Sequence, residues 1–138
     1  MFKISTKGDY GLLFLSALAQ KMNLGRSYVP LKEIACDKRL SLPYLSRIAI
    51  PLKKAGIIVS REGRDGGYRL AKPAKKISMM KVLEILEGPV APVKCCSDKK
   101  AKCGNESTCD TKFAWRDAKA VLVDFLKKKT LEEIMRKQ

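Results

Sequence analysis

The stretch that decides the fold is residues 28–58, YVPLKEIACDKRLSLPYLSRIAIPLKKAGII. Apolar residues recur in it at helical spacing in two short runs, which meet at a tight connection near residues 38–40. Ser41 suits the N-cap of the second helix, and Pro43 falls in its first turn, where a missing N–H costs little. The pattern predicts a helix-turn-helix. The residues expected to face the core are Leu31, Ile34, Ala35, Leu42, Leu45, Ile48 and Leu52.

Pro51 and Gly56 bear on where the second helix ends. A proline inside a helix removes one hydrogen bond and costs roughly 3 kcal/mol, so we expect a kink or an early end at Pro51. Gly56 fits the residue that closes the helix.

The next stretch, residues 56–73, reads GIIVSREGRDGGYRLAKP. Apolar and polar residues alternate on both sides of a glycine-rich tip, which predicts a β-hairpin with its turn near residues 63–67. A hairpin directly after a helix-turn-helix is a wing.

Helical spacing of apolar residues predicts further helices over residues 6–22, 77–86 and 111–129. The apolar stripe of the last helix is too long for a small domain to cover, so we expect it to pair with its copy in a homodimer. The expected fold is mainly α with a small β-hairpin wing. We expect a winged helix-turn-helix DNA-binding domain over residues 1–76, and a cysteine loop (95–109) followed by a long C-terminal dimerisation helix within residues 77–138.

The chain has a formal net charge of +15, and the charge is uneven along it. Residues 1–76 carry 16 Lys and Arg against 5 Asp and Glu, whereas residues 77–138 carry 13 against 9. Such a balance favours polyanions, of which nucleic acid is the commonest, although an acidic membrane surface has the same sign. The longest apolar run, residues 11–19, is too short to span a bilayer, and no signal-peptide pattern precedes it. We therefore expect a cytoplasmic protein bound to double-stranded DNA and not to a membrane.

The candidate DNA-binding surface comprises the second helix of the helix-turn-helix and the wing. Side chains near the start of a recognition helix reach base edges, while basic residues along it bind phosphates. Arg47 and Tyr44 are the best candidates for base contacts, and Arg64 at the hairpin tip has the reach to enter a minor groove. The alternative for any single residue is that it is an ordinary charged side chain exposed to solvent, without a role in DNA binding. The full set is Ser41, Tyr44, Ser46, Arg47, Lys53, Lys54, Arg61, Arg64 and Arg69.

A second candidate site is the cysteine loop, where Cys95, Cys96, Cys103 and Cys109 lie in one polar stretch of a chain without histidine. In a reducing compartment these thiols are ligands or redox groups rather than disulfides. Their spacing suits an iron-sulfur cluster better than the paired knuckles of structural zinc sites. Zinc and a metal-free thiol switch stay open as alternatives. Cys36, outside the loop, is expected to be a small buried hydrophobe.

Several motifs in this order resemble the Rrf-two family of bacterial winged-helix transcription regulators. STKGDYGLLFL (5–15) looks like the family's opening helix, LSLPYLSRI (40–48) like its recognition helix, and SREGRDGGYRLAKP (60–73) like its wing. VLEILEGPVAPVKC (82–95) leads into the cysteines as in the family, and FAWRDAKAVLVDFLKKKTLEEI (113–134) resembles its dimerisation helix and tail. The resemblance implies a homodimer on a partly palindromic operator. It also implies one iron-sulfur cluster per subunit, for which 2Fe-2S is favoured over 4Fe-4S.

The resemblance also implies the cluster ligands, which are Cys95, Cys103 and Cys109. IscR-like members place a histidine three residues after the last cysteine, where this chain has Lys112. NsrR-like members use an aspartate of the partner's opening helix, and Asp9 stands at that position, so Asp9 of the partner subunit or Cys96 is the expected fourth ligand. The expected function is cluster-controlled operator binding that senses iron-sulfur status, redox state or nitric oxide. The chain has no histidine, no paired acidic motif and no phosphate-cradling loop, so we do not expect an enzyme.

Overall fold

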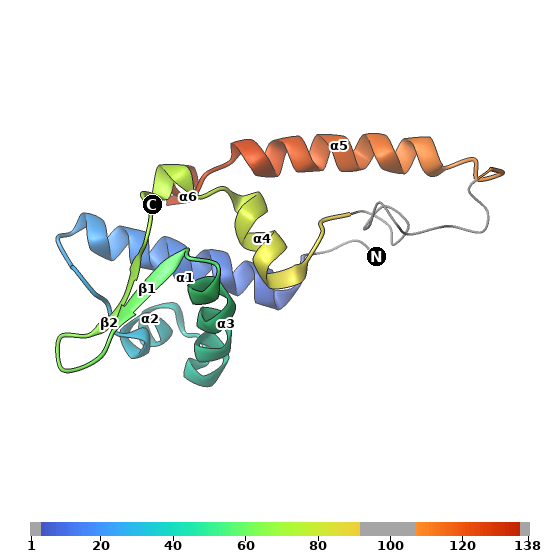
Figure 1. The fold of residues 1–138 in the computed structure, drawn as a ribbon. Coiled ribbons are helices and arrows are strands. Elements are labelled where there is room, and N and C mark those ends of the chain that lie inside the picture. The colour runs from blue at the N-terminus through green and yellow to red at the C-terminus, as the bar shows by residue number, and fades with distance from the viewer. Residues whose placement is uncertain (1–3, 92–106, 136–138) are drawn as a thin grey trace.

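The computed structural model describes residues 4–91 and 107–135 of the chain. It is mainly helical, with one two-stranded antiparallel sheet among these residues, which confirms the expected fold class (Figure 1). The described helices are α1 (Thr6–Asn23), α2 (Leu31–Lys38), α3 (Leu42–Lys54), α4 (Met79–Glu87), α5 (Lys112–Lys128) and α6 (Leu131–Met135), with a short 3-10 helix, η1 (Ala74–Lys76), and the strands are β1 (Ile58–Arg61) and β2 (Gly67–Leu70).

The helix-turn-helix is formed by α2 and α3, as the sequence predicts. Arg39 turns the chain between them in the left-handed conformation, with φ of 55°. Ser41 is the N-cap of α3, and its hydroxyl accepts a hydrogen bond from the backbone N–H of Tyr44 at 3.3 Å. The start of the recognition helix is therefore set by local capping chemistry.

The sequence predicted a kink or an early end at Pro51, and the early end was wrong, because α3 continues past the proline. The helix runs on to Lys54. The backbone N–H of Gly56 donates to the carbonyl of Lys53 at 3.0 Å, and that of Ile57 donates to the carbonyl of Leu52 at 3.0 Å. This is a Schellman motif, with Gly56 in a positive-φ conformation. Because Leu52 is fully buried and the motif satisfies the last carbonyls, the final turn is held in spite of the proline.

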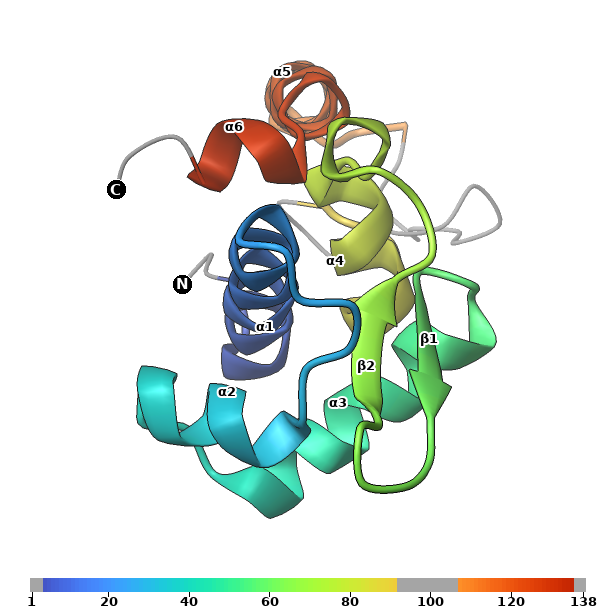
Figure 2. The ribbon, with the colours of Figure 1, turned by 90° about the vertical axis from the view of Figure 1, so that its left-hand side faces the viewer.

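The wing is an antiparallel hairpin in which Val59 pairs with Arg69 and Arg61 with Gly67. Its inner strand is tied to the connection between α1 and α2 by an isolated bridge from Val29 to Tyr68. Two backbone hydrogen bonds of 2.9 and 2.8 Å make this bridge. The connection thereby lies along β2 like a third strand (Figure 2).

The core is organised around α1, which contacts α2, α3, β2, α4 and α6. Phe14, Leu15 and Leu18 on this helix have no exposed surface. Leu83 of α4 and Leu126 of α5 belong to the same hydrophobic cluster as these residues. Leu42 was predicted to face inward, and this was wrong, because its side chain is 38% exposed. It lies at the edge of the apolar stripe that Leu45, Ile48 and Leu52 mark on α3, and no described element buries it.

The long helix α5 confirms the predicted element but is largely uncovered. Of its residues only Leu126 is buried. In Figure 1 the helix packs over α4 and leads into α6 at its C-terminal end, and its N-terminal half extends beyond the other described helices. Large apolar side chains are exposed along it: Phe113, Trp115, Val121 and Phe125. Within residues 4–91 and 107–135, none of the helices is both long and apolar enough to cross a bilayer.

Candidate nucleic-acid interface and cysteine site

The exposed face of α3 carries the cationic residues that the sequence singled out. Leu45, Ile48, Ala49 and Leu52 fix the buried face, so Ser46, Arg47, Lys53 and Lys54 lie on the opposite, exposed face. The hydroxyl of Ser46 donates to the carbonyl of Leu42 at 3.0 Å. Arg47 has no ion-pair partner within the described residues, so its guanidinium is available to a polyanion.

Ser41 and Tyr44, the other two candidates on this helix, take part in its packing. The Ser41 hydroxyl serves as the N-cap of the helix. Tyr44 is half-buried, and its ring meets the ring of Tyr10 edge-on at a centroid distance of 5.7 Å. Since each side chain already has a structural role, their contacts with DNA stay predictions.

The three candidate arginines of the wing occupy different positions. The Arg61 guanidinium stacks over the ring of Tyr28 at 4.2 Å and donates from Nη2 to the carbonyl of Asp65 at 2.7 Å. Arg69 approaches the same ring at 5.6 Å. Arg64 lies in the exposed turn between the strands. The structure thus brings two of the three arginines to one aromatic ring.

Three residues of this surface were missed from sequence. Ile50 is 56% exposed and follows Arg47 by one helical turn on the outer face of α3. Apolar side chains contact thymine methyl groups in major grooves, so the apolar character of Ile50 does not exclude it from a DNA-binding surface. Arg26 and Tyr28 lie in the connection between α1 and α2, which the bridge to Tyr68 brings beside the wing. No local sequence signal marks that pairing.

An ion-pair network anchors the same connection to α2. Arg26 binds both carboxylate oxygens of Glu33 at 2.9 Å, and Lys21 binds Glu33 at 2.9 Å and Asp37 at 2.7 Å. Hydrogen bonds from Arg26 and then from Lys21 lower the pKa of Glu33 to about 2. The bidentate geometry fixes Arg26 at the base of the wing.

Glu33→Gln is expected to lose a stability contribution that depends on pH. The folded-state pKa lies below the ordinary value of 4.5, so the contribution is fully present above about pH 4.5 and disappears as pH falls toward about 2. Urea unfolding of both proteins between pH 2 and 7 measures this. The variant should be less stable above pH 4.5, with the difference shrinking below it. Glu84→Gln, at an exposed glutamate with no ion pair in the described part of the chain, is the control. A difference that grew as pH fell would contradict the assignment.

Most of the cysteine site lies outside the described residues, because Cys95, Cys96 and Cys103 fall within 92–106. Cys109, just before α5, is half-buried, and its Sγ is 3.5 Å from Oγ1 of Thr111. Hydrogen bonds from the Thr111 side chain, and from backbone N–H groups of Thr111 and Lys112, lower the pKa of the Cys109 thiol. Cys36 is exposed on α2, so the prediction that it is buried was wrong. It falls beyond the edge of the face marked by Leu31, Ile34 and Ala35.

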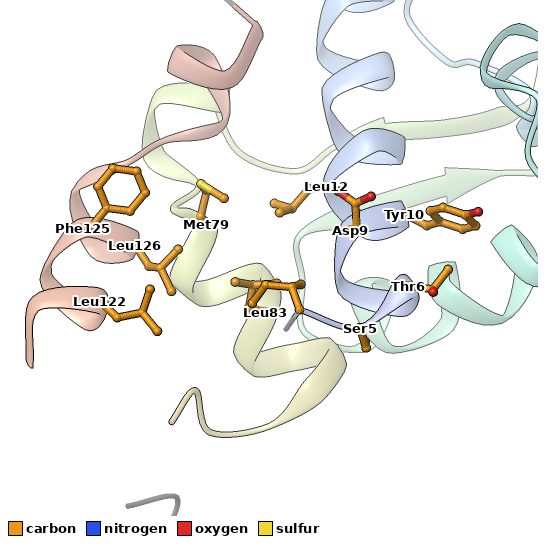
Figure 3. Close-up of a pocket in the computed structure, with 11 residues that line it drawn as sticks. Ser5, Thr6, Asp9, Tyr10, Leu12, Met79, Leu83, Leu122, Phe125 and Leu126 are labelled. Atoms are coloured by element: carbon orange, nitrogen blue, oxygen red, sulfur yellow. The ribbon is translucent and has the colours of Figure 1, made fainter. Parts of the chain in front are cut away.

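Asp9 lies on α1 and is exposed at the edge of a pocket between α1, α4 and α5 (Figure 3). The pocket has a volume of about 410 Å³ and a largely apolar lining that includes Leu12, Leu83 and Leu126. No three His, Cys, Asp or Glu residues come together as a metal site within the described residues. Asp9 is therefore a single carboxylate beside an apolar surface.

A helix-turn-helix with an adjoining hairpin and a basic outer face defines a winged-helix DNA-binding protein. Residues 4–137 match the family model of Rrf2, described as an iron-dependent transcriptional regulator. The chain belongs to the Rrf2 family of transcription regulators, which confirms the resemblance seen in the sequence.

The named relatives include regulators of two kinds. The regulator IscR of Vibrio vulnificus is 35% identical over 133 residues, which cover 96% of this chain and 77% of the relative. The regulator CymR of Bacillus subtilis is 40% identical over 98 residues, covering 71% and 70% of the two chains. The solved structure of CymR, the global cysteine regulator of B. subtilis, superposes with a TM-score of 0.81 at 33% identity, over 100% of this chain and 99% of that one. IscR of T. potens gives 0.74 at 32% identity, over 98% and 87%.

Proposed function

We propose that this transcription regulator binds a partly palindromic operator as a homodimer and that an iron-sulfur cluster controls the binding. The observation that carries the DNA-binding part is the exposed cationic face of α3 beside an arginine-bearing wing. In this proposal residues 1–76 bind DNA, and residues 77–138 hold the cluster and the dimerisation helix. The proposed DNA-binding residues are those predicted from sequence, with Arg47 as the principal base reader.

The uncovered length of α5 supports the homodimer. Val121 is 72% exposed and Phe125 52% exposed, although both are large apolar residues on a long helix. Pairing with a second copy removes this surface from water. Two recognition helices related by a two-fold axis then fit half-sites about one helical turn apart, so a small change in their spacing alters affinity.

The proposed cluster ligands are Cys95, Cys103 and Cys109, with Asp9 of the partner subunit or Cys96 as the fourth. Cys109 and Asp9, the two candidate ligands within the described residues, fit this role. The lowered pKa of Cys109 favours the thiolate, which is the form that binds metals. Asp9 is exposed, so a second subunit can approach it. A bound cluster would supply an oxidisable or displaceable anchor for the loop between α4 and α5, and we propose a 2Fe-2S centre.

Iron and sulfide content and the visible spectrum of anaerobically purified protein test the proposal. We expect about two iron and two sulfide per subunit with charge-transfer bands. Cys109→Ser should abolish the bands, whereas Cys36→Ser, the same change at an exposed cysteine outside the loop, should keep them. Asp9→Ala separates the two candidate fourth ligands, because an unchanged spectrum favours Cys96. Colourless, iron-free protein that binds its operator at full strength would overturn the cluster control.

A cluster-free thiol switch is the second candidate, and two observations favour it. The fold superposes well on a global cysteine regulator, and the Cys109 thiol has a lowered pKa. In that case operator binding changes on oxidation of iron-free protein and returns on reduction. Zinc found in place of iron would indicate instead a dimer that is held together by a structural zinc ion.

A further inference from the structure

We propose that a notch between the wing and the α1–α2 connection binds a DNA backbone phosphate and that Tyr28 positions its arginines. The inference rests on the proposed DNA-binding function and extends the interface beyond the recognition helix. The wing notch has a volume of about 440 Å³. It is lined by Arg26, Ser27, Tyr28 and Pro30 of the connection and by Arg61, Arg64, Asp65 and Gly66 of the wing.

The two walls of the wing notch are held together by the backbone. Val29 forms two hydrogen bonds with Tyr68, of 2.9 and 2.8 Å, and this joins the connection to β2 one residue away from Tyr28. Glu33 binds Arg26 through both of its oxygens, which fixes the other end of the same wall. The notch is thus formed before any ligand arrives, so less conformational entropy is lost on binding.

The charge of the lining selects an anion. The lining contains three arginines, Arg26, Arg61 and Arg64, and one acidic residue, Asp65. Because Arg26 is already paired with Glu33, Arg61 and Arg64 supply the positive charge that exceeds the single carboxylate of the lining. Arg61 uses one Nη to bind the backbone carbonyl of Asp65, and its remaining N–H groups have no partner within the described residues. Guanidinium groups bind phosphate in a planar, bidentate geometry, so an arginine-lined notch suits a phosphate.

Tyr28 gives the arginines a fixed orientation. Its ring lies 4.2 Å from the guanidinium carbon of Arg61 and 5.6 Å from that of Arg69. A guanidinium stacked on a ring keeps its N–H groups in its own plane, so they point past the ring edge and stay able to donate. Because the hairpin register places Val59 opposite Arg69 and Arg61 opposite Gly67, Arg61 and Arg69 share one face of the wing. Tyr28 is therefore a positioning residue and is not itself expected to contact the phosphate.

The position of the notch favours DNA over a free anion. Figure 2 shows the tip of the hairpin at the same end of the molecule as α2 and α3. A duplex lying against α3 therefore runs its backbone past the wing, where the notch is open to solvent. A small anion in such an open site gains few contacts, whereas a phosphodiester is already held by the rest of the interface.

The test is the salt dependence of binding to duplexes selected from a random pool, measured by fluorescence anisotropy for wild type, Tyr28→Ala and Tyr28→Phe. Tyr28→Ala removes no charge, yet we expect about tenfold weaker binding and a log–log salt slope smaller by about 1, because one phosphate contact is lost. Tyr28→Phe keeps the ring and should restore both values. The loss should be similar for selected and random duplexes, since phosphates carry no sequence information.

Arg61→Gln and the double variant show whether Tyr28 acts through Arg61. The double variant should bind no more weakly than Arg61→Gln alone. Lys75→Gln, which removes one charge in η1 away from the wing tip, should change the slope less than Arg61→Gln does. Circular dichroism identifies any variant that fails to fold. If Tyr28→Ala does not fold, the difference in salt slope between Arg61→Gln and Lys75→Gln shows whether the wing notch binds a phosphate.

Wild-type protein that binds DNA with a steep salt slope, together with a Tyr28→Ala variant of unchanged affinity and slope, would overturn the notch and leave the proposed function standing. Wild-type protein without salt-dependent DNA binding would overturn both. Inorganic phosphate, titrated at constant ionic strength, should not compete below the millimolar range. If inorganic phosphate does compete with DNA below the millimolar range, and Arg61→Gln abolishes this competition, the notch binds a small anion instead of DNA.

Discussion

Val121→Asp is expected to give a monomer that binds a two-half-site operator about a hundredfold more weakly than the wild type, or worse. Val121 is 72% exposed in one chain and lies on the apolar face of α5. If this face packs against its copy, the substitution buries two unpaired carboxylates near the two-fold axis, which disfavours the dimer strongly. Joining two recognition helices raises the effective concentration of the second half-site, and the monomer loses that advantage. Analytical ultracentrifugation and anisotropy with full and half operators measure both effects.

Leu24→Asp is the matched control for this experiment. Leu24 is 83% exposed at the end of α1, so the substitution makes the same change of type and charge away from α5. It should leave a dimer with operator affinity within a few-fold of the wild type. Val121→Asp and wild type should bind a single half-site equally well. A dimeric Val121→Asp protein with unchanged operator affinity would remove α5 from the interface.

The parts of the fold that the sequence predicts are those set by local chemistry. The capping hydroxyl of Ser41, the positive φ of Gly56 and the glycines of the hairpin act within a few residues of themselves, so the helix-turn-helix and the wing could be placed without a structure. Pro51 shows the limit of local reasoning. A local argument predicts a break there, but α3 continues past the proline, and the burial of Leu52 and the hydrogen bonds that close the helix hold its last turn.

The parts that the sequence does not predict depend on contacts between distant segments. Tyr28 and Arg61 are 33 positions apart and meet only because Val29 pairs with Tyr68. The exposure of Cys36 and Leu42 likewise depends on where neighbouring elements end, since each lies at the margin of an apolar stripe. Burial at a stripe's centre is fixed by periodicity, whereas burial at its edge is decided by tertiary packing.

Gly67→Ala is expected to destabilise the protein by about 3 kcal/mol and to lower the melting temperature by roughly 10 °C. Gly67 has φ of 139°, a conformation that side chains disfavour, and an added Cβ would overlap the carbonyl of Val29. That carbonyl belongs to the bridge between Val29 and Tyr68, so the backbone cannot yield without breaking the two hydrogen bonds that join the wing to the α1–α2 connection.

Gly63→Ala separates the steric part of this effect from the conformational part. Gly63 lies in the turn of the same hairpin with φ of 102°, but a Cβ there would meet nothing within 4 Å. Its substitution should cost about 1 to 2 kcal/mol, the price of the backbone conformation alone. Thermal unfolding of the two variants under identical conditions gives the difference. Equal losses would mean that the wing tolerates separation from the connection. Because the wing notch is built across that junction, Gly67→Ala should also lower DNA affinity in the folded protein more than Gly63→Ala does.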